Sequence, residues 1–329
     1  MNRSGSHGLA CGLKADWNDC LELGQHGESV FVSFQMRFAL KIYMEISELL
    51  DHKDERAWAE SELKSLDNNL TEHSWDGEWF LRAYRDDGLK FGSKENEEGS
   101  IFLNPQSWSV ICGHASEQQA DLAMSAVYEK LATEYGVMVC APPFEETDFR
   151  VVRATMMNPG MKENGGIFVH TQGWIVMAET MLGHGNRAYS YFRSSMPSAY
   201  NSRADIREIE PYVYCQSTHS KYSSRYGVSR IPWLSGSAAW AYYAATQYIL
   251  GIQPDYHGIR IDPCIPSEWK EFSIKRLFRG KILHIIVLNP SGVEKGVQTV
   301  RLNGKEMNSN LIRMEALNRE NELVVMMGK

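Results

Sequence analysis

The sequence has no excess of positive charge. Its 329 residues include 34 Lys and Arg against 41 Asp and Glu, which gives a net charge of −7 at pH 7. A protein that follows a nucleic-acid backbone needs a basic face. The charge balance therefore excludes nucleic acid as an expected partner.

Long hydrophobic runs are also missing. The longest apolar stretch, residues 238–252, is interrupted by Tyr, Thr and Gln and is too short to span a bilayer. The first seven residues lack the apolar segment of a secretory signal. We therefore expect no membrane span and a cytoplasmic location.

Closely spaced cysteines are absent. The six cysteines are far apart and none belongs to a C-x-x-C pair: Cys11, Cys20, Cys112, Cys140, Cys215 and Cys264. This spacing indicates neither a zinc site nor a disulfide framework. The sequence also lacks a P-loop, a zinc-protease helix motif and a G-x-S-x-G elbow. We expect no metal and no cofactor.

The composition itself, 43% hydrophobic and 23% charged, is that of a soluble globular protein. Apolar residues recur at the three-to-four spacing of amphipathic helices through most of the chain. The segments with this period are 28–50, 55–71, 117–135, 173–182, 188–196 and 236–250. Long connections rich in Gly, Trp and Asn separate them, including a predicted loop at 104–108. Connections of this length are typical of loops that carry a site.

The pattern changes near residue 252. Short alternating segments follow, at 258–262, 272–278, 281–289, 296–302 and 322–327, with turn signals such as Asn289-Pro290 and Asn303-Gly304 between them. The sequence therefore predicts a mainly α chain, with a helical domain over residues 1–252 and a small antiparallel β domain over 253–329.

Three strings carry side chains suited to chemistry. Asp16-Trp17-Asn18-Asp19 combines carboxylates, an amide and an indole that could bind sugar hydroxyls and stack on a sugar ring. The alternative is an ordinary loop followed by a helix capped by Asp19 or Ser29. On composition alone the ordinary loop is favoured.

The other two strings also have structural alternatives. Lys162-Glu163-Asn164-Gly165-Gly166 precedes His170, which a salt-bridged turn and a core histidine would explain. Ser235-Gly236 opens the last long helix, where backbone N–H groups can bind phosphate. A serine N-cap is the commoner explanation for that position.

Five strings occur in order along the chain: Ala15-Asp16-Trp17-Asn18-Asp19-Cys20, Lys162-Glu163-Asn164-Gly165-Gly166-Ile167-Phe168, Glu210-Pro211-Tyr212-Val213-Tyr214, Trp233-Leu234-Ser235-Gly236 and Gln247-Tyr248-Ile249-Leu250-Gly251-Ile252. Together they resemble the cellobiose and cellodextrin phosphorylases of glycoside hydrolase family 94. The resemblance covers nearly the whole chain. It implies part of an (α/α)6 toroid followed by a small β-sandwich domain.

The resemblance also implies roles for single residues. Asp19 corresponds to the general acid, Trp17 to a contact of the sugar whose bond breaks, and Lys162 and Glu163 to the acceptor-sugar subsite. Phosphate ligands correspond to His170 and to Ser235-Gly236, which replaces the Thr-Gly pair of the family. Gln216 matches a glutamine near the same site.

These roles imply inverting phosphorolysis of a β-linked disaccharide or oligosaccharide of the cellobiose or cellodextrin type to α-glucose 1-phosphate. Phosphate is a co-substrate and is already anionic, so one catalytic carboxylate suffices. The family further implies a homodimer. Its upstream segments, which supply an arginine and an aspartate, have no counterpart here, so the resemblance implies a carboxyl-terminal part of the enzyme.

Two other functions remain open. An inverting hydrolase on the same toroid would need a second carboxylate on the water side, such as Glu163 or Glu210. A carbohydrate-binding remnant without catalysis would bind sugar but release no product. Phosphate-dependent turnover distinguishes these functions from a phosphorylase.

Overall fold

The computed structural model describes residues 4–13 and 16–328. The chain forms two compact units, residues 1–174 with 194–237, and residues 175–193 with 238–329. Helices hold 37% of the residues and strands 24%. A mixed architecture of helix and sheet therefore replaces the mainly α chain that was expected. The toroid and the domain boundary at residue 252 stay predictions.

The helices follow the predicted apolar periods closely. They are α1 (Val30–Leu49), α2 (Lys53–His73), α3 (Leu103–Ile111), α4 (Glu117–Lys130), α5 (Val169–Met181), α6 (Gly185–Ser195), α7 (Ala204–Arg207) and α8 (Ser235–Tyr243), with a π-helical segment over Ala244–Ile249. The predicted loop at 104–108 is wrong, because α3 covers it. Every residue of α3 is buried, so the helix has no amphipathic period to detect, and Pro105 lies in its first turn, where proline is tolerated.

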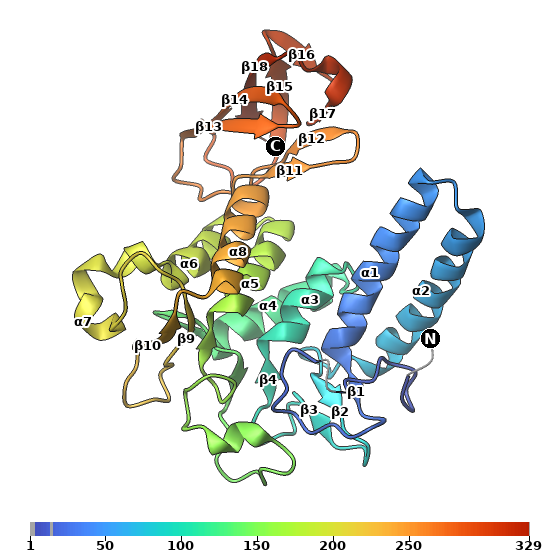
Figure 1. Ribbon diagram of the computed structural model, residues 1–329, viewed down its shortest axis with the longest axis vertical. Helices are drawn as coiled ribbons and strands as arrows, with labels where there is room; N and C mark the ends of the chain where they lie inside the picture. The colour runs from blue at the N-terminus through green and yellow to red at the C-terminus, as the bar shows by residue number, and fades with distance from the viewer. Residues whose placement is uncertain (1–3, 14–15, 329) are drawn as a thin grey trace. The chain divides into compact units, whose positions relative to one another are not determined.

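Helices α1 and α2 form an antiparallel pair that lies side by side (Figure 1). Ser29 caps α1, since its hydroxyl accepts a hydrogen bond of 3.1 Å from the backbone N–H of Val32. Phe31 and Phe34, in the first turns of α1, are fully buried. The beginning of α1 is therefore fixed both by its cap and by its packing.

The strands of the first unit are short. They form the sheets β1-β2-β3, β10-β9-β8, β4-β7 and β5-β6. Their bounds are β1 (Glu28–Ser29), β2 (Ala83–Tyr84), β3 (Lys90–Phe91), β4 (Ile101–Phe102), β5 (Ala132–Thr133), β6 (Gly136–Val137), β7 (Cys140–Ala141), β8 (Ile167–Phe168), β9 (Cys215–Thr218) and β10 (Ser229–Pro232). Strands of two to four residues are too short to show alternation, so the sequence did not predict them.

The second unit contains the longer strands. They are β11 (Ile252–Pro254), β12 (Gly258–Ile261), β13 (Glu271–Phe278), β14 (Lys281–Leu288), β15 (Val297–Leu302), β16 (Lys305–Met307), β17 (Leu311–Arg313) and β18 (Glu320–Met327). They form a three-stranded sheet, β11-β12-β17, and a five-stranded sheet, β13-β14-β18-β15-β16. The five predicted alternating segments are confirmed as strands.

One strand pair departs from the antiparallel prediction. Strand β18 pairs in parallel with β14, while its other neighbour, β15, is antiparallel to it. A parallel pair needs a long connection, and residues 289–319 provide it. Leu283 and Ile285 of β14, and Leu323 and Val325 of β18, are buried at alternating positions. The packing of the two sheets into a sandwich stays a prediction.

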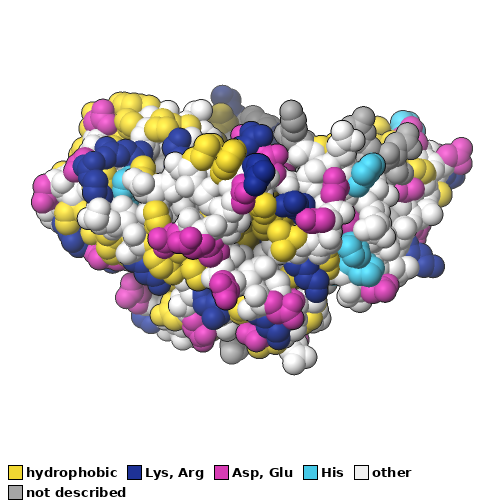
Figure 2. All heavy atoms as spheres, turned by 90° about the horizontal axis from the view of Figure 1, so that it is seen from below, with side chains coloured by type: hydrophobic (Ala, Val, Ile, Leu, Met, Phe, Trp, Pro, Cys, Tyr) yellow, Lys and Arg dark blue, Asp and Glu magenta, His cyan; other side chains and the backbone are white. Residues whose placement is uncertain are grey.

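The core beneath the motif loops is apolar and well packed. It joins Phe91, Phe102, Phe144, Val152 and Phe168, among other buried residues, and Trp17 and Cys20 pack against it. Among the described residues, no helix is long and apolar enough to cross a membrane. On the face drawn in Figure 2, acidic and basic side chains are intermixed.

Candidate active site

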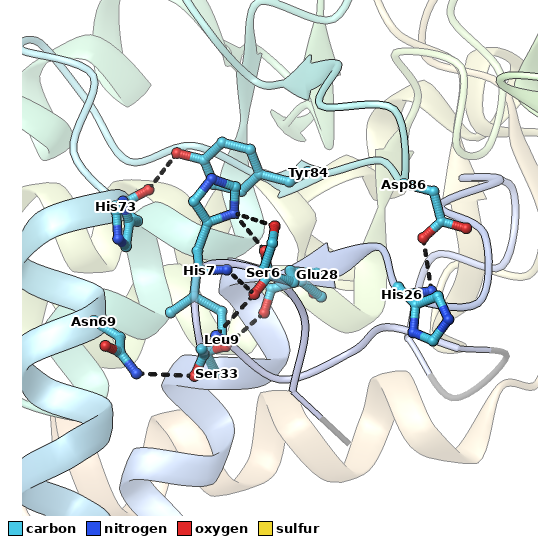
Figure 3. A network of polar contacts seen from close by, with 12 residues as sticks. Ser6, His7, Leu9, His26, Glu28, Ser33, Asn69, His73, Tyr84 and Asp86 are labelled. Atoms are coloured by element: carbon cyan, nitrogen blue, oxygen red, sulfur yellow. Dashed lines mark hydrogen bonds and ion pairs between the residues drawn. The ribbon is translucent and has the colours of Figure 1, made fainter.

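The loop that carries the first motif is closed at its base. The backbone N–H of Gly12 donates to the carbonyl of Gly27 over 3.0 Å, and that of Ser29 donates to the carbonyl of Ala10 over 2.9 Å. Figure 3 shows how the preceding segment is held. There the buried carboxylate of Glu28 accepts from the backbone N–H groups of His7 and Leu9. Loop 12–27 therefore begins and ends on fixed backbone.

Asp16, the first residue of the motif, is buried and paired with Arg82. Both guanidinium nitrogens Nη1 and Nη2 donate to the Asp16 carboxylate, and the side chain of Arg82 is fully buried. The hydroxyl of Ser29 also donates to Asp16, over 2.6 Å. Burial by itself raises the pKa of Asp16, but the charge of Arg82 and the hydrogen bonds bring that pKa below its ordinary value.

Asp19 lies exposed between two anchored neighbours. The backbone N–H of Asn18 donates to Asp16 over 2.9 Å. The buried side-chain oxygen of Asn18 in turn accepts from the backbone N–H of Cys20 over 3.1 Å. The backbone on both sides of Asp19 is therefore fixed, while its carboxylate faces solvent.

The structure brings Asp19 and Glu163 together. Ligand atoms of Asp19, Cys20 and Glu163 all lie within 4.8 Å of one another. Burial raises the pKa of Glu163, and the nearby charge of Asp19 adds to that shift, whereas Lys162 opposes it. Burial, followed by Glu163 and Asp19, raises the pKa of the Cys20 thiol to about 12. Exposed acidic groups often cluster without binding an ion, so we assign no metal to these three side chains.

A tight turn presents Lys162 and Glu163. Lys162 has a φ of +46°, and the backbone N–H of Gly166 donates to the carbonyl of Lys162. A Cβ on Gly166 would lie 2.5 Å from the nitrogen of Lys162, so only glycine fits there. The buried amide of Asn164 fixes the turn by donating to the carbonyls of Phe144 and Met157. The glycine pair of the motif therefore serves the geometry of the turn.

His170 contacts the first motif directly. The indole N–H of Trp17 donates to Nδ1 of His170 over 3.1 Å, and the Trp17 ring packs edge-on against Phe168. Because Nδ1 is the acceptor, the neutral imidazole carries its proton on Nε2. Burial lowers the pKa of His170, which favours this neutral form.

The sheet β10-β9-β8 joins the segment that precedes His170 to the segments that carry Gln216 and precede Ser235. In this sheet β8 and β10 flank β9, and both run antiparallel to it. Phe168 at the end of β8 pairs with Ser217, and Pro232 at the end of β10 pairs with Cys215. The ends of β8 and β10 therefore lie at the same edge of the sheet.

Helices α5 and α8 begin at that edge. His170 is the second residue of α5, while Ser235 and Gly236 are the first two of α8. Neighbouring strands are about 4.8 Å apart, so β8 and β10 lie roughly 10 Å from each other on either side of β9. The hydroxyl of Ser237 donates to the carbonyl of Cys215 over 2.9 Å, which ties α8 to β9. Two helix N-termini thus share one edge, and anions bind at such ends.

Gln216 lies in β9 between the two helix starts. Its Oε1 is buried and has no hydrogen-bond partner within residues 4–13 and 16–328. A Cβ added to the exposed Gly236 would meet nothing within 4 Å. The edge of the sheet therefore offers both an unused polar atom and open space.

Arg82 was missed by the sequence reasoning. It is the only charged residue of the apolar string Phe80-Leu81-Arg82-Ala83-Tyr84, all of which is buried. A lone charge among apolar residues indicates a buried ion pair, and that signal was available. Its partner, 66 positions away, was not.

Two sequence profiles match the chain. The Glycosyl hydrolase 94 superfamily, catalytic domain, matches residues 1–251, and the Glycosyl hydrolase family 65, C-terminal domain, matches residues 254–307.

Curated relatives extend the match. The N,N'-diacetylchitobiose phosphorylase of Vibrio furnissii is 38% identical over 98% of this chain and 40% of its own length. The solabiose phosphorylase of Paenibacillus borealis is 34% identical over 92% of this chain and likewise 40% of its length. The chain therefore spans about 40% of these relatives. A solved structure titled Sialidase shares the fold, with a TM-score of 0.61 over 94% of this chain and 29% of its own, at 14% identity.

Proposed function

The chain belongs to the glycosyl hydrolase 94 superfamily, and on that premise we propose that it carries out inverting phosphorolysis of a β-linked disaccharide. Phosphate attacks the anomeric carbon, the glycosidic C–O bond breaks, and Asp19 gives its proton to the departing sugar oxygen. The products are an α-configured sugar 1-phosphate and a free sugar. Asp19 regains its proton from solvent or from the next hydrogen phosphate.

The shared sheet edge is the observation that carries this proposal. Phosphate would bind where α5 and α8 begin, because both helices direct backbone N–H groups toward it. We assign the Nε2–H of His170, the hydroxyl of Ser235 and the backbone of Gly236 as donors to phosphate. Gln216 lies between them, and its amide would complete the shell.

Trp17 would connect the two halves of the reaction. Its indole N–H bonds to His170, and it stands two residues before Asp19 in the same anchored loop. An aromatic face there can stack on the donor sugar. The nucleophile and the acid would then be held by one continuous set of contacts.

The spacing of the carboxylates argues against Asp19 and Glu163 acting as the acid and base of an inverting hydrolase. An inverting hydrolase places its two carboxyl groups about 6.5–9.5 Å apart, which leaves room for a water molecule. Asp19 and Glu163 have oxygens within 4.8 Å of each other. We therefore assign Glu163, with Lys162, to the acceptor sugar. The other hydrolase candidate, Glu210, is half-buried and accepts a hydrogen bond from the indole of Trp233.

Because the chain is similar to the Vibrio furnissii enzyme, we would test N,N'-diacetylchitobiose before cellobiose and cellodextrin. The P. borealis relative has a different sugar in its name at nearly the same identity. The substrate class proposed here is accordingly a β-linked disaccharide, and cellobiose remains one member of it.

The test is phosphorolysis by the purified protein. N,N'-diacetylchitobiose, solabiose, cellobiose and cellotriose are each incubated with and without inorganic phosphate, and products are followed by ³¹P and ¹H NMR. We expect an α-sugar 1-phosphate only when phosphate is present. Release of free sugar without phosphate would identify a hydrolase. Binding without any product would identify a carbohydrate-binding protein.

A further inference from the structure

The buried pair of Arg82 and Asp16 lies outside the chemistry assigned above. The side chain of Arg82 is completely buried. Its guanidinium lies over the rings of Phe31 and Phe102, at 5.2 and 5.9 Å from their centroids. Its Nε is buried without a hydrogen-bond partner among the described residues. The Asp16 carboxylate is the charge that balances it.

A pair of this kind is poor evidence for stability alone. Removing two charges from water is costly, and well-packed neutral side chains of similar volume often stabilise a fold equally well or better. The unpartnered Nε adds to the cost. A role in fixing geometry would give the pair a use other than stability.

The hydrogen bonds of Asp16 lead to the general acid. Asp16 accepts from the backbone N–H of Asn18, and Asn18 accepts from that of Cys20, so the chain of contacts encloses Asp19. Trp17 follows Asp16 directly and contacts His170. The hydrogen bonds of Asp16 thus set the path of the backbone that presents the proton donor.

Ser29 connects this chain of contacts to a rigid element. Its hydroxyl donates to Asp16, accepts from Arg82 over 3.0 Å and also accepts from Val32 at the start of α1. The loop that carries Asp19 is therefore anchored to the N-terminus of α1. Arg82 directly precedes β2, the central strand of the sheet β1-β2-β3.

We infer that Arg82 and Asp16 are positioning residues that hold the loop of Asp19 so that its carboxyl reaches the departing sugar oxygen. This inference rests on the proposed function. Neither residue touches the substrate. Misplacement of a catalytic group by about 1 Å can lower turnover about 10²-fold.

The test separates positioning from stability with a neutral double variant. Asp16→Asn and Arg82→Met each leave one buried group without its charged partner, so each lowers the Tm. The double variant Asp16→Asn/Arg82→Met removes both charges, and with them the guanidinium that holds the side chain at position 16 in place. We expect it to recover most of the lost Tm, but to turn over the disaccharide at least about 10²-fold more slowly than wild type.

An activated donor shows which step is affected. The 2,4-dinitrophenyl β-glycoside of the donor sugar needs no proton for its leaving group, so its phosphorolysis by the double variant should stay within about fivefold of wild type. The matched control is Arg37→Met, which breaks the Arg37–Asp67 pair in the same unit. It should lower the Tm and leave the ratio of the two turnover rates unchanged.

Two kinetic results would overturn the inference. In the first, the double variant recovers disaccharide turnover together with Tm. In the second, it loses turnover equally with the disaccharide and with the 2,4-dinitrophenyl β-glycoside. Backbone amide exchange gives a readout that does not depend on turnover. We expect the amides of Asn18 and Cys20 to be protected in wild type and to lose protection in the double variant, and unchanged protection would also overturn the inference. Failure of wild type to form any sugar 1-phosphate would instead count against the proposed function alone.

Discussion

The indole N–H of Trp17 donates a hydrogen bond of 3.1 Å to Nδ1 of His170, across 153 positions of the sequence. This bond selects the tautomer of His170 with its proton on Nε2. It also joins the anchored loop of Asp19 to the start of α5. A substitution on either side of the proposed reaction centre should therefore affect the geometry of the other side.

Asp19→Asn should lower turnover of an unactivated disaccharide by about 10²–10⁴-fold, because the proton donor is lost. The same variant should still phosphorolyse a 2,4-dinitrophenyl β-glycoside. Its Tm should match wild type, since Asp19 is exposed. The exposed Asp51, at the turn after α1, provides the control Asp51→Asn. Disaccharide turnover by Asp19→Asn at the wild-type rate would remove Asp19 from the mechanism.

His170→Ala should raise the KM for phosphate more than the KM for sugar. A lost hydrogen bond to a charged ligand costs about 1.5–3 kcal/mol, or roughly 10- to 100-fold in affinity. Initial rates over a grid of phosphate and sugar concentrations separate the two constants. His52→Ala, on an exposed side chain, is the control. Equal changes in both constants would mean that His170 has only a structural role.

Gly236→Ala should separate stability from phosphate binding. A Cβ at Gly236 meets no atom within 4 Å, and alanine is favoured over glycine in a helix by about 0.5–1 kcal/mol. The variant should therefore unfold at the same temperature as wild type or a higher one. Its KM for phosphate should nevertheless rise, because the methyl group enters the space assigned to phosphate. An unchanged KM would place phosphate elsewhere.

The stability of the protein should fall below about pH 6.5, the ordinary pKa of histidine, partly because of His219. Burial, followed by the charges of Arg230 and Arg225, lowers the pKa of His219 in the folded state. The unfolded chain then binds the proton more readily, so this contribution is present above the unfolded pKa and is lost as pH falls through the folded pKa.

Urea unfolding at pH 7.5, 6.0 and 5.0 tests this prediction. His219→Gln should show a shallower loss of unfolding free energy than wild type over that range. His114, whose pKa is also lowered mainly by burial, should account for part of the remaining slope. Identical slopes for wild type and His219→Gln would mean that His219 does not titrate differently on folding.

The positions of the helices could be predicted from the sequence because their apolar period is local. Helices α1, α2, α4, α5, α6 and α8 follow it. The fully buried α3 has no polar face, so its period is absent and a loop was predicted in its place. The long strands after residue 252 alternate and were predicted, whereas the parallel pairing of β14 with β18 depends on contacts between distant segments.

The candidate site divides in the same way. Asp19, Trp17, Lys162, Glu163 and His170 stand in short strings whose residue types can be read directly from the sequence. What those side chains meet depends on distant parts of the chain: Arg82 on Asp16, Glu163 on Asp19, and the sheet that sets the starts of α5 and α8 at one edge. The sequence determined which groups are present and where helices begin, because both depend on near neighbours. Only the tertiary structure decided which groups meet, because strand pairing and buried ion pairs join residues that no local pattern relates.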